Sequence, residues 1–229
     1  MEETFSLALG LGFLLGLKHA IEADHVIAVT TIVSQQGSVL RSGLVGMLWG
    51  IGHTISLFIA GIFVIFLQVA IPEGVATILE FSVALMIIFL GGRILYYLLR
   101  NRKKVHSHQH SHENTINNKV DNGKSFFANL SFQPLIVGMV HGLAGSAALT
   151  LLVLTEVMRG DKQLLGLIYL LVFGIGSIGG MLLISVFISL PFVFTSTKLE
   201  NIHIPIKFFA SVASIIFGFY YAWEVLTGA

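Results

Sequence analysis

Apolar residues occur in six long runs separated by short polar stretches, at about 5–33, 43–70, 75–99, 133–158, 163–190 and 206–227. A helix needs about 20 mainly apolar residues to cross roughly 30 Å of bilayer hydrocarbon. The pattern therefore predicts an all-α integral membrane protein with six transmembrane helices. At about 1.5 Å per residue the first run is too long for one straight crossing. We predict that this helix is interrupted near a group of polar residues.

The composition agrees with a membrane protein and narrows the chemistry. Hydrophobic residues make up 55% of the chain and charged residues 11%, against about 25% charged residues in soluble domains. A net charge of +1 gives no basic field that would indicate a nucleic-acid partner. Because cysteine is absent, nitrogen and oxygen atoms would have to hold any metal ion. The N-terminus lacks the positive region of a signal peptide, so we expect the first span to be retained.

The one long hydrophilic segment, 100–131, predicts the topology. It carries Arg100, Arg102, Lys103, Lys104, Lys119 and Lys124, and an excess of basic residues marks cytoplasmic loops. We therefore expect a cytoplasmic loop, both termini outside, and three parts, 1–99, 100–131 and 132–229. The alternation of histidine with small polar residues from His106 to His112 is interpreted as a solvated linker of weak metal-binding composition.

Short similarities indicate an internal repeat. Gly16-Leu-Lys-His19 aligns with Gly138-Met-Val-His141, Trp49-Gly-Ile-Gly52 with Phe173-Gly-Ile-Gly176, and Ile87-Ile-Phe-Leu-Gly91 approximately with Ile215-Ile-Phe-Gly218. Since each copy would hold three spans, the two copies would be inserted upside down relative to each other. Inverted repeats are a recurring architecture of membrane transporters, with the site near mid-bilayer at the repeat interface.

Five ionisable residues, Lys18, His19, Glu22, Asp24 and His25, interrupt the first apolar run. Each costs about 2.5–3.5 kcal/mol at mid-bilayer on insertion scales, so a functional role is the default hypothesis. The two imidazoles and two carboxylates predict a divalent-metal site. On an unbroken helix they cannot all reach one ion, because Asp24 points away from the strip formed by the others. Either the helix opens between Ala20 and Asp24, or His53 and His141 share the ligation and one carboxylate supports a ligating imidazole.

Purely structural roles are the alternative for several of these residues. Lys18 would pair with Glu22 four residues later, and His53 and His141 would form interhelical hydrogen bonds. Most glycines of the first, second and fifth spans are expected at close helix contacts, namely Gly10, Gly12, Gly16, Gly46, Gly50, Gly52, Gly174, Gly176, Gly179 and Gly180. Gly142, Gly145 and Ser146 would instead leave room for an ion path.

Three motifs resemble the nickel/cobalt transporter family. His19-Ala-Ile-Glu-Ala-Asp24-His25 is similar to its signature of histidine, four residues, aspartate and histidine, and Gly50-Ile-Gly52-His53-Thr54 looks like its second glycine-histidine motif. The six-span form with Val140-His141-Gly-Leu-Ala-Gly-Ser is more similar to the urease-accessory nickel permease branch. The resemblance implies Ni²⁺ uptake, with Co²⁺ as a second substrate, across a bacterial cytoplasmic membrane. It also implies a functional link to a nickel enzyme such as urease.

These observations together predict a permease rather than an enzyme, with Ni²⁺ or Co²⁺ as transported substrate and no prosthetic group. The predicted metal-binding residues are His19, Glu22, Asp24, His25, His53 and His141. Three alternatives stay open: an exporter of the same fold, an intramembrane hydrolase in which the same residues activate water, and a haem or electron carrier with paired histidines. The oligomeric state is open as well, a homo-oligomer included.

Overall fold

The computed structural model describes residues 2–67, 71–105, 132–144, 163–198 and 200–228. Within these ranges the regular structure is entirely helical. The helices are α1 (Glu2–His19), α2 (Ala23–Val33), α3 (Val39–Leu67), α4 (Glu73–Val105), α7 (Gln163–Lys198), α8 (Glu200–Thr227) and a short apolar helix, Gln133–Ala144.

Four helices of the described ranges, α3, α4, α7 and α8, are long and apolar enough to cross a membrane. A fifth crossing is made if α1 and α2 form one broken span, since the two are bent by 54° at a short break. The predicted all-helical fold and the interruption of the first helix are thus confirmed. The predicted span 133–158 is described only over Gln133–Ala144. Residues 145–158 lie outside the described ranges, so the count of six spans stays a prediction.

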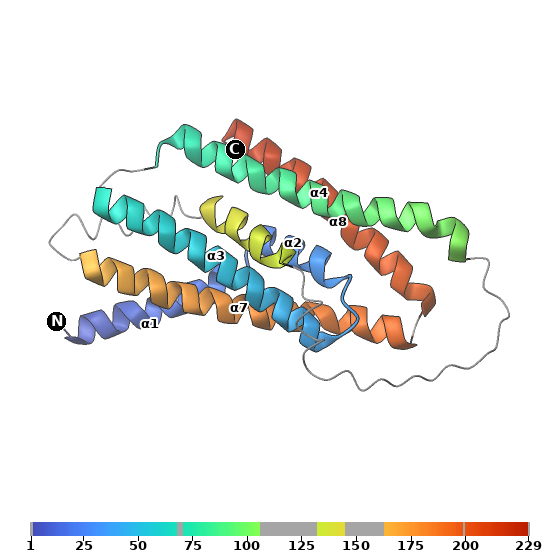
Figure 1. Ribbon diagram of the computed structural model, residues 1–229, viewed down its shortest axis with the longest axis horizontal. Coiled ribbons are helices and arrows are strands. Elements are labelled where there is room, and N and C mark those ends of the chain that lie inside the picture. Colours follow the sequence, from blue (N-terminus) through green and yellow to red (C-terminus); the bar gives the residue numbers. More distant parts are fainter. Residues whose placement is uncertain (1, 68–70, 106–131, 145–162, 199, 229) are drawn as a thin grey trace.

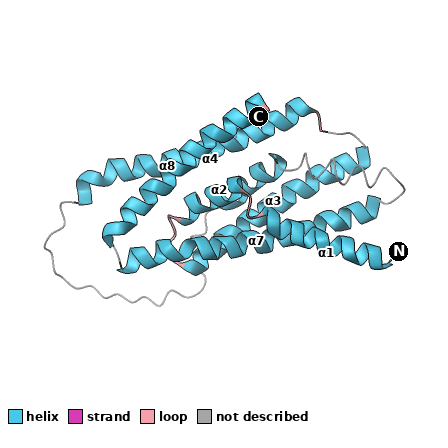
Figure 2. Ribbon diagram, turned by 180° about the vertical axis from the view of Figure 1, so that it is seen from behind, coloured by secondary structure: helices cyan, strands magenta, loops and turns pink. Residues whose placement is uncertain are grey.

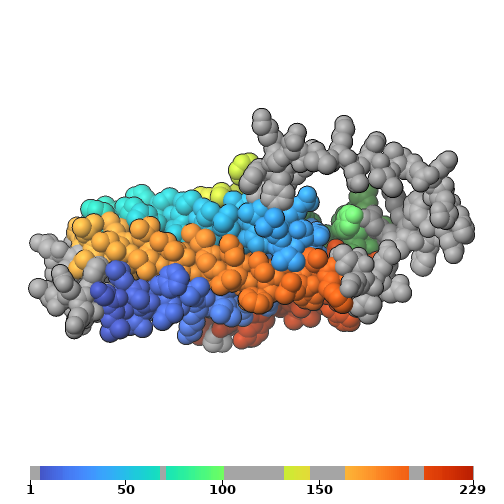
Figure 3. Space-filling model, turned by 90° about the horizontal axis from the view of Figure 1, so that it is seen from below, coloured from blue at the N-terminus to red at the C-terminus, as the bar shows by residue number. Residues whose placement is uncertain are grey.

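The helices are arranged in two groups. In one, α1, α3 and α7 lie side by side, and they form the face seen in Figure 3. In the other, α4 pairs with α8, and α2 and the helix Gln133–Ala144 lie between the groups (Figures 1 and 2). The buried core joins α2, α3 and α7, where Val29, Trp49 and Met181 are fully enclosed.

Glycines bring these helices into close contact. A Cβ atom added at Gly16 would meet the carbonyl oxygen of Phe173, and one added at Gly52 would meet that of Leu135. Small residues at such crossings let helix backbones approach closely in membranes. The predicted packing role holds for most of the listed glycines. It is wrong for Gly10, which has no neighbour within 4 Å of an added Cβ.

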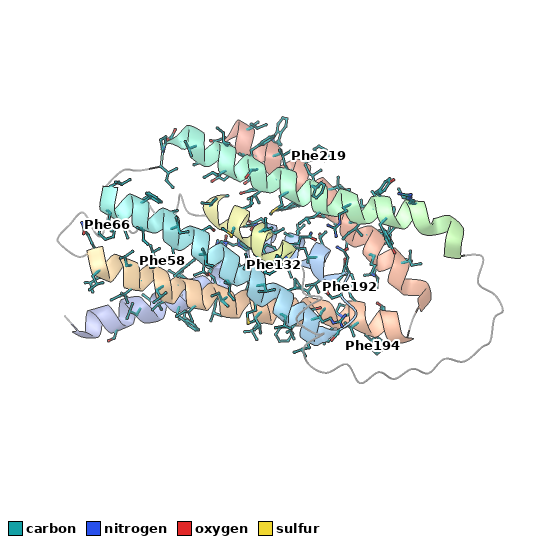
Figure 4. The ribbon with its side chains drawn as sticks, viewed as in Figure 1. Phe58, Phe66, Phe132, Phe192, Phe194 and Phe219 are labelled. Carbon is teal, nitrogen blue, oxygen red and sulfur yellow. The ribbon has the colours of Figure 1, made fainter. Side chains whose placement is uncertain are left out.

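Large apolar side chains cover much of the outer surface. Phe66, Phe132, Phe194 and Phe219 are each more than half exposed, whereas Phe192 is buried; all five are labelled in Figure 4. Extended apolar surface of this kind marks a membrane-interacting protein. The side chains that face outward are therefore suited to lipid, and the buried interior carries the polar residues described next.

Candidate metal centre

The break between α1 and α2 creates the centre. Helix α1 ends at His19, and backbone hydrogen bonds from Ile21 to Lys18 (2.9 Å) and from Glu22 to His19 (3.1 Å) tighten the chain into turns. Glu22 then has an extended backbone (φ −63°, ψ 149°), and α2 begins at Ala23. On a straight helix Asp24 would point away from His19. The change of direction at Glu22 removes this obstacle, so both side chains can face the same cluster.

His19 lies at the junction of α1 with α3. Its Nε2 atom is 3.2 Å from Nε2 of His53 on α3, and its Nδ1 atom is 2.9 Å from Oε2 of Glu22. The ring of His25, on α2, lies 4.5 Å from that of His19 and 5.3 Å from that of His53, centroid to centroid. Three imidazoles from three helices therefore face one another.

Asp24 joins the second half of the group. Its Oδ1 atom accepts a hydrogen bond from the backbone N–H of His25 (2.8 Å) and lies 3.0 Å from that residue's Nδ1 atom. Its Oδ2 atom is 2.8 Å from Nε2 of His141, which comes from the helix Gln133–Ala144. The rings of His25 and His141 are 4.1 Å apart. One carboxylate thus bridges two histidines from different parts of the chain.

The centre is largely shielded. His25, His53 and His141 are at most 1% exposed, whereas the side chains of His19, Asp24 and Glu22 are 12%, 18% and 53% exposed. Among the described residues, three buried imidazole nitrogens have no hydrogen-bond partner, namely Nε2 of His25, Nδ1 of His53 and Nδ1 of His141, and neither has the indole Nε1 of Trp49. Buried polar atoms are normally paired. The unpaired Nε2 atom of His25 is therefore available as a ligand for an ion.

All six residues predicted from the sequence come together in this cluster. The ligand atoms of all but Glu22 form two groups that meet the spacing of a metal site, His19–His25–His53 and Asp24–His25–His141. Neutral imidazole and carboxylate suit nickel, cobalt or zinc, and ligand type alone does not choose among them. Metal binding by these residues remains a prediction.

Two aromatic residues beside the cluster were not predicted as part of it. The ring of Trp49 stacks on His25 (6.1 Å, 14°) and lies 5.7 Å from His141, while Phe173 lies 5.5 Å from His19. The sequence held a signal, since the repeat aligns Trp49 with Phe173 just as it aligns His141 with His19. Aromatic rings thus lie beside three of the four histidines.

Two expectations at this site are wrong. Glu22 pairs with His19 rather than with Lys18, because Glu22 lies beyond the end of α1, and Lys18 is exposed. Gly142 leaves no open space, since an added Cβ would meet the carbonyl oxygen of His53 and the hydroxyl of Ser56. Gly145, Ser146 and the tract His106–His112 lie outside the described residues.

A family model described as high-affinity nickel-transport protein (NicO) matches residues 5–199, which include all six clustered residues. The chain belongs to this family. Over 218 residues it is 38% identical to the urease accessory protein UreH of Bacillus sp. (strain TB-90), covering 95% of this chain and 91% of that relative. No solved structure matches the chain.

Membership of the nickel-transport family confirms the resemblance found in the motifs, the urease-accessory branch included. It also identifies the chain as a multi-pass membrane transport protein rather than an enzyme. This rules out the hydrolase alternative, and the cluster is a candidate site for a transported ion.

Proposed function

We propose that this chain is a permease that carries Ni²⁺, with Co²⁺ as a second substrate, into the cell through the histidine–aspartate cluster. The observation that carries the proposal is the convergence of His19, Asp24, His25, His53 and His141 from four helices on one largely buried cluster. Ionisable groups inside a membrane protein are costly, and they mark ion pathways.

The chemistry of the cluster fits the proposed cargo. Four imidazoles offer nitrogen ligands of the kind that nickel accepts, and Asp24 supplies a negative charge against the charge of the ion. Glu22 accepts a hydrogen bond from Nδ1 of His19 (2.9 Å), which leaves Nε2 of that ring as the ligand atom. Carboxylates commonly hold ligating histidines in this way. We assign Glu22 this supporting role, and the other five residues the role of ligands.

Two inverted three-helix repeats would carry the cluster, and reciprocal contacts support this part of the proposal. An added Cβ at Gly16 would meet the carbonyl of Phe173, and one at Gly138 would meet that of Trp49. These are equivalent contacts under the sequence repeat. In the same way α3 and α7 run antiparallel, with Gly50 against Ile178 and Gly174 against Thr54. Such symmetry places a site at the interface of the repeats, where opening can alternate between the two sides.

The expected setting is the bacterial cytoplasmic membrane, with segment 100–131 in the cytoplasm and both termini outside. The relative's name, urease accessory protein, supports supply of nickel to an enzyme such as urease. An imported ion would then be released on the side where such an enzyme matures.

The test is uptake of radioactive Ni²⁺ by cells that express the chain, compared with Asp24→Asn and His19→Ala variants. Glu73→Gln serves as a matched control, because it neutralises an exposed carboxylate at the start of α4, outside the cluster. We expect accumulation with the unaltered chain and Glu73→Gln and none with the other two, at equal amounts of protein in the membrane. Competition with Co²⁺, Zn²⁺ and Mn²⁺ ranks the substrates. Depletion of cellular nickel would show an exporter instead, and normal uptake by Asp24→Asn would refute the site.

A further inference from the structure

The cluster divides into two overlapping groups of three residues, and His25 belongs to both. The ligand atoms of His19, His25 and His53 lie within 4.8 Å of one another, and so do those of Asp24, His25 and His141. Three protein ligands, completed by water, are enough to hold a divalent transition metal ion. Each group therefore has the ligands for an ion of its own.

His25 offers a different nitrogen to each group. Its Nδ1 atom lies 3.0 Å from Oδ1 of Asp24 and so belongs with Asp24 and His141. Its Nε2 atom is buried and has no hydrogen-bond partner among the described residues, which leaves it for the other group. The two nitrogens of an imidazole are distinct sites on different edges of the ring. One ion cannot use both, so the two groups define two ion positions, one on each edge of His25.

Each group of three also contains one side chain that is partly exposed. The first has one partly exposed member, His19, and the second also has one, Asp24, with side chains 12% and 18% exposed. The shared residue, His25, is 1% exposed. Each position can thus be reached through its own outer ligand, while the passage between the two runs past a buried imidazole.

We infer that the transported ion occupies these two positions in turn and that His25 hands it from one to the other. The inference rests on the proposed function. While the ion is held by His19, His25 and His53, Asp24 accepts hydrogen bonds from Nδ1–H of His25 and Nε2–H of His141. When it is held by Asp24, His25 and His141, those two nitrogens are ligands.

The handover leaves both rings neutral. The proton of His25 moves from Nδ1 to Nε2 and that of His141 from Nε2 to Nδ1, each carried by a water molecule that accompanies the ion, so that each ring exchanges one tautomer for the other and no net proton is gained. Both receiving nitrogens belong to the buried atoms that have no hydrogen-bond partner among the described residues. No existing hydrogen bond on the described part of the chain has to be broken at them.

Two ion positions with three protein ligands each also suit transport better than a single position with five protein ligands. Passage through a selective site requires binding strong enough for entry, yet weak or divided enough for release. Five protein ligands on one ion would hold it firmly. Dividing them around His25 keeps part of the ion's water in place and lets each new ligand replace an old one.

The test is a double-mutant cycle on the purified full-length protein, with Ni²⁺ affinity measured by titration calorimetry. The variants are His53→Ala, His141→Ala and the pair together, with Glu73→Gln as control. Since each single variant keeps the other group intact, we expect its affinity to fall by less than about tenfold, the lower limit for loss of a supporting residue. The double variant should lose far more than the product of the two. Neither single variant should carry Ni²⁺ in the uptake assay.

A single shared site predicts a different result, because each single variant would then remove a ligand from the only coordination sphere and lose much more than tenfold in affinity, and losses within one network do not multiply as independent contributions. X-ray absorption of the Ni²⁺-loaded variants gives a second readout. His53→Ala should show two imidazoles and a carboxylate, and His141→Ala should show three imidazoles. His53→Gln and His141→Gln, which preserve more side-chain volume, replace any alanine variant that elutes as aggregate. Single-variant losses far above tenfold, or identical ligand sets, overturn the handover alone, whereas an unaltered chain that neither binds nor carries Ni²⁺ overturns the proposed function itself.

Discussion

The Nε2 atoms of His19 and His53 face each other at 3.2 Å, although the two residues are 34 positions apart and belong to α1 and α3. Two imidazole nitrogens in this position either share one proton or direct two lone pairs at a cation. Glu22 favours the second arrangement for His19, since its carboxylate accepts the proton on Nδ1 (2.9 Å).

We therefore predict that Glu22→Gln weakens Ni²⁺ binding by about tenfold, at the mild end of the effects of such supporting residues, because Glu22 is half exposed and an amide still accepts a hydrogen bond. Titration calorimetry of the purified protein measures the change, with Glu73→Gln as the matched control. Affinity equal to that of the control would remove Glu22 from the site.

Tryptophan fluorescence can report ion binding at His25. The chain has two tryptophans, Trp49 and Trp223; Trp49 stacks on His25 at 6.1 Å, whereas Trp223 is 65% exposed on α8. In a Trp223→Phe variant, fluorescence reports on Trp49 alone. We predict that Ni²⁺, with its open d shell, quenches this emission, and that Zn²⁺, with a filled shell, quenches it much less.

Adding His25→Ala to Trp223→Phe should abolish the quenching at the same Ni²⁺ concentration, because that substitution removes a ligand from both groups of three. Quenching that survives His25→Ala would place the ion away from this histidine.

Much of the site was accessible from the sequence because ionisable residues in an apolar span are so costly that few positions carry them. The interruption near Ala20 followed from the length of the apolar run and from the impossibility of bringing Asp24 and His19 to one ion on a straight helix. The pairing of Glu22 with His19 could not be predicted from the sequence, because a spacing of four residues favours Lys18 as the partner only while the helix continues. The approach of Trp49 to His25 depends on tertiary packing, which the sequence pattern does not determine.

Glycine packing around the site gives a stability prediction. An added Cβ at Gly52 would meet the carbonyl oxygen of Leu135, while one at Gly10 would have nothing within 4 Å. Overpacking a tight contact costs about 1–3 kcal/mol, so Gly52→Ala should lower the thermal unfolding temperature in detergent and Gly10→Ala should not. Equal unfolding temperatures for the two variants would contradict the close crossing of α3 with the helix Gln133–Ala144.

The pairing of α4 with α8 tests the inverted repeat. Gly91 lies against the carbonyl oxygen of Ser211, and Gly218 lies against that of Ala84. The repeat aligns Gly91 with Gly218, and each of these glycines lies against a carbonyl oxygen seven residues before the other glycine, which makes the two contacts reciprocal. A Cβ added at Gly91 would lie 2.8 Å from the oxygen of Ser211, and one added at Gly218 would lie 3.1 Å from that of Ala84. Each glycine therefore allows the same close approach of the other helix.

Gly91→Ala and Gly218→Ala should therefore destabilise the protein by similar amounts, about 1–3 kcal/mol each, measured by thermal unfolding in detergent. Gly92→Ala is the control, since it adds the same methyl group one residue away, where no atom lies within 4 Å. Because the two substitutions widen the same helix crossing, their combined effect should be smaller than the sum of the two, as is usual for residues that share a contact. A large loss from one glycine and none from the other would show that the crossing lacks the two-fold equivalence that alternating access through inverted repeats requires.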